Sequence, residues 1–180
     1  MATQVTSVGR PDSAEYLPYY SRYISQVSTD DVVSYLEQQG RDLSAKWATI
    51  TESQSIYRYA PGKWSAKEVV GHVSDSERVF AYRALRISRN DRTPMEGFEQ
   101  DDYVRDGPFG HLAWSSLVEE FRNVRAATVS LFRGLNEEEA LRRGIANKAE
   151  VTVRALAWII AGHAQHHSQV LRNSYQLPKT

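Results

Sequence analysis

The sequence contains no cysteine. A chain without thiols forms no disulfide bond, builds no cysteine-based zinc site and has no cysteine nucleophile. If the protein binds a metal ion, the ligands must therefore be histidine and carboxylate side chains.

An excess of charge of one sign is also missing, because 22 Lys and Arg residues balance 22 Asp and Glu residues. There is consequently no global basic field to attract nucleic acid or anionic lipid. Arg83, Arg86, Arg89 and Arg92 do cluster, but such runs usually solvate a helix face. We therefore expect a small-molecule substrate, and neither nucleic acid nor a membrane as a partner.

Long apolar runs are absent. No stretch approaches the roughly 18 to 20 residues that span a bilayer. The first residues, MATQVTSVGRPDS, lack the apolar segment of a signal peptide. These features predict a cytoplasmic protein. The chain has 180 residues and no internal repeat, low-complexity tract or linker, which predicts one folded domain.

Residues 1–28 are predicted to form an N-terminal extension, and residues 29–180 the main domain. The extension contains Pro11, Pro18 and several tyrosines, among them Tyr19 and Tyr23. This mixture predicts a disordered start followed by a short aromatic segment that packs on the domain.

Four segments of the main domain show the apolar spacing of amphipathic helices. Ser65 and Glu68 form a predicted capping box, Gly134 is placed to end the third helix, and Thr152 to cap the fourth. No strand pattern competes with these helices, so the predicted fold class is all-α. The predicted helices cover residues 29–50, 65–89, 111–133 and 151–173.

The connections between these helices differ in length. Residues 91–110 show no sustained period and are predicted to form a long loop, which Phe98, Tyr103 and Phe109 dock onto the bundle. Asn136 is predicted to cap a short acidic turn that serves as a spacer before the fourth helix.

His163 and His167 are four residues apart in the fourth predicted helix. Residues with this spacing lie on one face, and zinc-binding helices use it to supply two ligands. Leu156 and Ile160 mark the same face as inward, whereas His166 is turned away. A single histidine on an apolar face is more often a hydrogen-bonded core residue, but two at this spacing are harder to satisfy with ordinary partners.

His72 lies on the apolar stripe of the second predicted helix and is the candidate third ligand. Considered alone, it is better explained as a core histidine. Together with His163 and His167, it places three imidazoles on the inner stripes of two helices, as in bundles with metal sites in their cores. Three imidazole ligands leave positions open for water or substrate, and they favour zinc or nickel, with iron and manganese also open. A divalent ion lowers the pKa of a bound water or thiol.

Three segments resemble the DinB-like superfamily, whose relatives include YfiT-type metal-dependent hydrolases and bacillithiol transferases. They are GKWSAKEVVGHVSDSERVFAYR at 62–83, GFEQDDYV at 97–104 and VTVRALAWIIAGHAQHHSQVL at 151–171. The resemblance covers essentially everything after residue 30 and implies a four-helix bundle with up-down-down-up topology. It also implies one metal ligand on the second helix and two from an HxxxH on the fourth, which are His72, His163 and His167 here.

The resemblance implies an activity less firmly than a fold. It predicts a metal-dependent transferase or hydrolase, in which the ion activates a low-molecular-weight thiol cosubstrate or water to attack a small electrophile. The absence of cysteine fits a thiol supplied from outside, and equally fits no thiol chemistry. The alternative is a non-catalytic metal-binding or stress-response module.

Glu77, Asp101 and Asp102 are the predicted catalytic carboxylates, which would orient a ligand or move a proton. Adjacent acids such as Asp101 and Asp102 are more often simply solvated. The family pattern is also looser here, because Glu99 stands where aspartate is more common. Homodimerisation through exposed helix faces is a further expectation.

Overall fold

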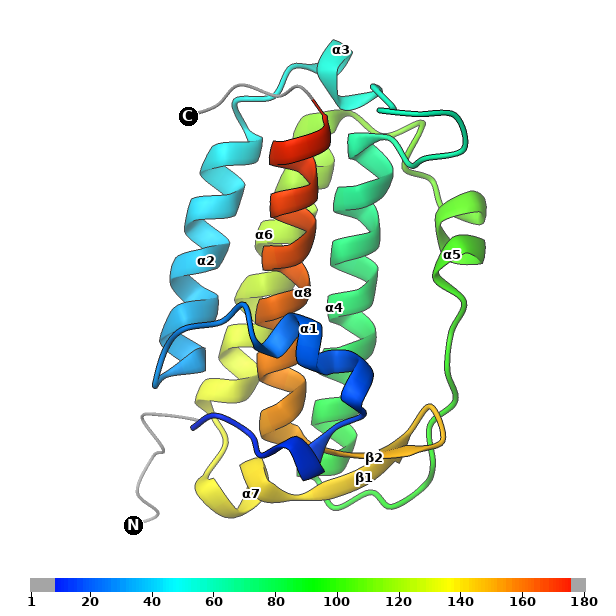
Figure 1. Ribbon diagram of the computed structural model, residues 1–180. Coiled ribbons are helices and arrows are strands. Elements are labelled where there is room, and N and C mark those ends of the chain that lie inside the picture. The colour runs from blue at the N-terminus through cyan, green and yellow to red at the C-terminus, as the bar shows by residue number, and fades with distance from the viewer. Residues whose placement is uncertain (1–8, 176–180) are drawn as a thin grey trace.

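The computed structural model describes residues 9–175, and the predicted disordered start falls largely outside them. Four long helices form the predicted bundle, which confirms the fold class (Figure 1). They are α2 (Val32–Trp47), α4 (Ala66–Ser88), α6 (Trp114–Arg133) and α8 (Val153–Ser174). Over residues 9–175, none of the helices is both long and apolar enough to cross a bilayer.

Local signals set the starts of three of these helices. Ser65 accepts a hydrogen bond from the Glu68 amide, and the Glu68 carboxylate accepts one from the Ser65 amide, so the predicted capping box is present. The Thr152 side chain caps α8 as predicted, and Asp31 caps α2. The third helix begins at Trp114, three residues after the predicted start at His111, which is exposed. Its N-cap Ala113 makes no side-chain capping hydrogen bond.

The order of the helices explains the long connection between α4 and α6. In Figure 1, α2 and α8 run upward whereas α4 and α6 run downward, which is the up-down-down-up topology. The helix α4 packs against both α8 and α6, and α2 packs against both α6 and α8. Because the neighbours α4 and α6 are parallel, the chain between them has to return along the whole bundle.

This return segment is more structured than the predicted loop. It contains a short helix, α5 (Gln100–Asp106), which packs against α4. Two helical turns are too short to show a sustained period in the sequence, which is why α5 was not predicted. Phe109 is buried as expected and its ring lies where a side chain at Gly71 would be, whereas Tyr103 stays exposed.

The predicted spacer before α8 contains a β-hairpin that the sequence pattern did not indicate and that leaves the four-helix bundle unchanged. After the short helix α7 (Glu137–Leu141), which Asn136 caps as expected, β1 (Arg143–Ala146) pairs antiparallel with β2 (Ala149–Thr152). The turn residues Asn147 and Lys148 both have positive φ, at 50° and 63°. Two-residue hairpin turns of this kind usually have the sequence Asn-Gly. The turn was not predicted here because lysine takes the place of the glycine.

The N-terminal segment lies across α8 (Figure 1). It comprises η1 (Ser13–Glu15), η2 (Pro18–Tyr20) and α1 (Ser21–Ile24); a further short helix, α3 (Glu52–Ser55), follows α2. A Cβ at Gly162 would lie 2.2 Å from the Tyr23 carbonyl oxygen, so only glycine lets α1 approach α8 this closely.

Burial disfavours ionisation of Glu15, but hydrogen bonds from Arg154 and from other donors outweigh it and lower the pKa of Glu15 to about 2.

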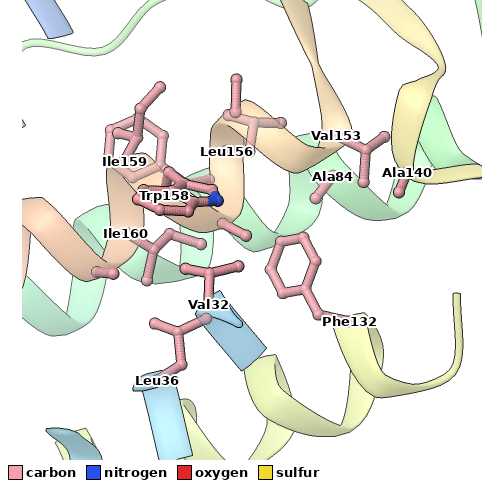
Figure 2. Close-up of a cluster of buried hydrophobic side chains, with 14 of the residues drawn as sticks. Val32, Leu36, Ala84, Phe132, Ala140, Val153, Leu156, Trp158, Ile159 and Ile160 are labelled. Carbon is pink, nitrogen blue, oxygen red and sulfur yellow. The ribbon is translucent and has the colours of Figure 1, made fainter. Parts of the chain in front are cut away.

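The core consists of two hydrophobic clusters. The first includes Val32 and Leu36 of α2, Phe132 of α6, and Leu156, Trp158 and Ile160 of α8 (Figure 2). The second lies toward the other end and includes Trp47, Val69, Trp114, Phe121 and Leu171. On α8, Ala161 belongs to the first cluster and Ala164 to the second. His163 lies between these two alanines in the sequence, and therefore where the two clusters meet.

A buried polar network connects all four long helices at this level. Arg125 of α6 donates two hydrogen bonds of 2.8 Å to the Glu77 carboxylate of α4. It also donates to Leu36 O (3.1 Å) and Gln39 Oε1 (2.8 Å) of α2, and Gln39 donates to Ala161 O of α8 (2.9 Å). The side chains of Arg125 and Glu77 are both almost fully buried, so each charge is compensated in the core by the charge of the other.

We expect the Arg125→Ala variant to lose about 3–5 kcal/mol of unfolding free energy, because it leaves the Glu77 carboxylate buried without a partner. The double variant Glu77→Leu/Arg125→Met should recover most of that loss. Urea denaturation followed by tryptophan fluorescence measures both values.

Arg122→Ala is the matched control, because Arg122 lies one turn earlier on the same helix with a side chain that is 64% exposed. Its change should stay within about 0.5 kcal/mol. An Arg125→Ala variant no less stable than this control would contradict the role given to the network.

Candidate metal centre

The structure brings His72, His163 and His167 together. One ring nitrogen of each lies within 4.8 Å of the other two. His72 Nε2 and His163 Nε2 are 3.1 Å apart, and the three ring centroids are 4.5 to 4.9 Å apart. His72 and His163 are buried and His167 is half-buried. The cluster joins α4 to α8, which pack directly against each other.

Burial keeps the three imidazoles neutral. It lowers the pKa of His72 to about 4. Burial, followed by the proximity of the other histidines, lowers the pKa values of His163 and His167 well below 6.5. At neutral pH each ring therefore keeps a lone pair, which is the form that binds a metal ion.

The donor set fits a divalent cation. Two ring nitrogens bound at about 2.1 Å to a tetrahedral ion lie about 3.4 Å apart, close to the distance between His72 and His163. That distance would also suit an N–H···N hydrogen bond between the two rings. Such a bond leaves His167 unexplained, because no residue in 9–175 forms a hydrogen bond with its ring. A cation would use the lone pairs of all three rings.

Ser76 is placed to orient His72. Its Oγ lies 3.4 Å from His72 Nδ1, on the next turn of α4. If Nδ1 carries the ring proton and donates to Ser76, the Nε2 lone pair faces His163. Sequence reasoning missed this role, although the four-residue spacing between His72 and Ser76 was available as a signal.

Aromatic side chains enclose the cluster. The Trp64 ring centroid lies 4.9 Å from that of His72, and the Phe80 centroid 6.1 Å from that of His163. The Tyr23 ring stands edge-on to both His163 (5.3 Å) and His166 (5.4 Å). Tyr23 was predicted to pack on the domain, but its contact with the histidines was not, because that contact depends on how α1 crosses α8. His166 is half-buried and is not part of the group of three.

The predicted carboxylates lie elsewhere. Both oxygens of Glu77 accept hydrogen bonds from Arg125. Asp101 and Asp102 lie on α5 and are exposed, and Asp102 pairs with Arg105. Among residues 9–175, none of the three belongs to the group that could hold a metal ion. Their catalytic role stays a prediction.

A family model matches most of the chain. The model described as "DinB superfamily" matches residues 35–171. "Putative metal-dependent hydrolase YfiT" of Bacillus subtilis is 25% identical in an alignment of length 167, and the match covers 85% of this chain and 86% of that protein.

Two solved structures share the fold. One is titled "YfiT from Bacillus subtilis is a probable metal-dependent hydrolase with an unusual four-helix bundle topology"; its TM-score is 0.68 at 19% identity, over 88% of this chain and 93% of that one. The other is "the mycothiol-dependent maleylpyruvate isomerase", with a TM-score of 0.66 at 11% identity, over 81% of this chain and 61% of that one. The names of the relatives and the histidine cluster together imply a metal ion of unspecified identity.

We expect His163→Ala to abolish metal binding. Protein purified without added metal should contain about one divalent ion per chain in the wild type and at least about tenfold less in this variant, because one of three ligands is lost. Elemental analysis by plasma mass spectrometry measures both. His166→Ala, on the same helix, is the control and should keep the wild-type content. Equal metal content in wild type and His163→Ala would contradict the assignment.

Ser76→Ala should weaken metal binding by about tenfold or more, because the His72 ring loses the partner that orients it. Ser74→Ala is a closely matched control, since Ser74 and Ser76 are both 1% exposed and Ser74 donates to Val70 O instead. Competition with a fluorescent zinc chelator gives the affinities. If both variants bind the metal equally well, Ser76 does not orient His72.

Proposed function

This chain belongs to the DinB superfamily, and from that membership and its histidine cluster we propose that it is a metal-dependent enzyme acting on a small electrophilic substrate. The observation that carries the proposal is the convergence of three neutral imidazoles from two helices, two of them buried and one half-buried. His72, His163 and His167 would hold the ion, which when bound would lower the pKa of a water or thiol. Zinc or nickel suits these ligands best.

The chain's own residues would prepare this chemistry in two ways. Trp64, Phe80 and Tyr23 cover the cluster with aromatic rings and limit the access of bulk water. His167 is the most exposed of the three ligands, so we place the approach of the substrate on its side. Asp101 and Asp102 remain candidates to orient a ligand only if α5 moves toward this side.

Hydrolysis and thiol transfer are the two reactions to separate. Hydrolysis is supported by the names of the related proteins, which describe metal-dependent hydrolases. Thiol transfer is supported by the name of the maleylpyruvate isomerase, which depends on mycothiol, and by the absence of cysteine from this chain. In a thiol transfer, the low-molecular-weight thiol would release its proton to solvent and its sulfur would form a bond to the electrophilic carbon. The leaving group would depart from that carbon with the electron pair of the bond that breaks.

The test combines two substrates with one panel of thiols. Metal-loaded wild type should turn over either a nitrophenyl ester without thiol, or a chloro-dinitroaromatic only when a small thiol is present. Turnover should fall at least about 100-fold in His163→Ala and stay near the wild-type rate in His166→Ala. Metal binding at the cluster without turnover of either substrate would favour the non-catalytic metal-binding module.

A further inference from the structure

Tyr175 follows α8 directly, and its side chain is only 2% exposed. Its hydroxyl group donates a hydrogen bond of 2.6 Å to Trp64 O, in the segment that leads into α4. The end of α8 and the start of α4 lie at the same end of the bundle (Figure 1). This hydrogen bond therefore ties together the two helices that carry the metal ligands His72, His163 and His167.

Trp64 connects the hydrogen bond to one of these ligands. The ring centroids of Trp64 and His72 are 4.9 Å apart, and the ring planes are tilted by 50°. Ser76 Oγ lies 3.4 Å from Nδ1 of the same imidazole. The indole and Ser76 together restrict rotation of the His72 ring about its Cβ–Cγ bond, and Nε2 stays directed at His163 Nε2, 3.1 Å away.

Other side chains hold the backbone before α4, but they come from nearby residues. Arg58 donates to Lys63 O over 2.7 Å and to the Glu68 carboxylate over 2.8 Å. Glu68 in turn belongs to the capping box that starts α4. Within residues 9–175, the bond from Tyr175 is the hydrogen bond that links Trp64 to α8.

We propose that Tyr175 is a positioning residue of the metal centre, which acts through Trp64 on the His72 ring. Without the hydroxyl group, the Trp64 carbonyl loses its link to α8 and the indole can shift against His72. The imidazole then samples orientations in which Nε2 does not face the other two histidines. Metal affinity falls, because part of the binding free energy goes into ordering the ring. The inference rests on the metal centre of the proposed function, but not on turnover of a substrate.

Competition with a fluorescent zinc chelator tests the proposal. Tyr175→Phe removes the hydroxyl group alone and should bind zinc about two- to tenfold more weakly than the wild type, the range expected for one hydrogen bond. Tyr59→Phe is the matched control and should bind zinc like the wild type. The Tyr59 ring packs 5.1 Å from the Tyr175 ring, and its hydroxyl group forms no hydrogen bond in the described part of the chain. Equal affinities of wild type and Tyr175→Phe, or equal losses in the two variants, overturn the proposal.

A double-mutant cycle tests whether the effect passes through Trp64. Trp64→Ala should itself weaken zinc binding. Adding Tyr175→Phe to that variant should cause less than about a twofold further loss, because there is no indole left to position. A further loss as large as in the wild-type background overturns the role of Trp64. If Trp64→Ala does not fold, Trp64→Leu takes its place in the cycle.

Two measurements on the metal-free protein separate positioning from a contribution to stability alone. The NMR order parameter of the His72 Cε1–H bond should be lower in Tyr175→Phe than in the wild type and in Tyr59→Phe. A lower melting temperature of Tyr175→Phe with an unchanged order parameter and unchanged zinc affinity overturns the proposal.

The same experiments distinguish this inference from the proposed function. A wild type that binds zinc but turns over neither test substrate overturns the enzymatic function and leaves the positioning role of Tyr175 in place. A wild type that binds no zinc overturns both.

Discussion

The buried ion pair between Arg125 and Glu77 is the polar interaction that connects the four long helices at the level of the histidines. It connects α6 to α4 directly, and through Gln39 it reaches α2 and the Ala161 carbonyl of α8. Ala161 lies two residues before His163, and Glu77 lies five residues after His72. The network therefore fixes the two helices that carry the metal ligands close to the ligands themselves. Both carboxylate oxygens of Glu77, whose catalytic role stays a prediction, accept hydrogen bonds in this network.

The histidine cluster depends on that rigid frame in a second way. Three neutral imidazoles lie at the junction of two hydrophobic clusters, and their burial is the main cause of their lowered pKa values. At neutral pH the three rings are not protonated, so their lone pairs stay free. A hydrogen bond between two of the rings leaves the third ring without a partner. A divalent cation is the partner that uses all three lone pairs. The chemistry proposed here follows from this imbalance together with membership of the DinB superfamily.

The sequence predicted those features that depend on neighbouring residues. The caps at Ser65 and Thr152 and the shared face of His163 and His167 are local, and the structure contains them. The meeting of His72 with α8 depends on topology, which came from the family resemblance and not from spacing. The β-hairpin was missed because Lys148 takes a positive φ that lysine seldom adopts. The pair of Arg125 with Glu77 could not be predicted, because burial of a charge is decided by packing between distant segments.

Anomalous diffraction at the absorption edge of the metal in crystals of the protein as purified tests the central claim most directly. We predict a single strong peak within bonding distance, about 2.1 Å, of one ring nitrogen each of His72, His163 and His167. No peak at the three histidines, or a peak bound by other residues, would contradict the account.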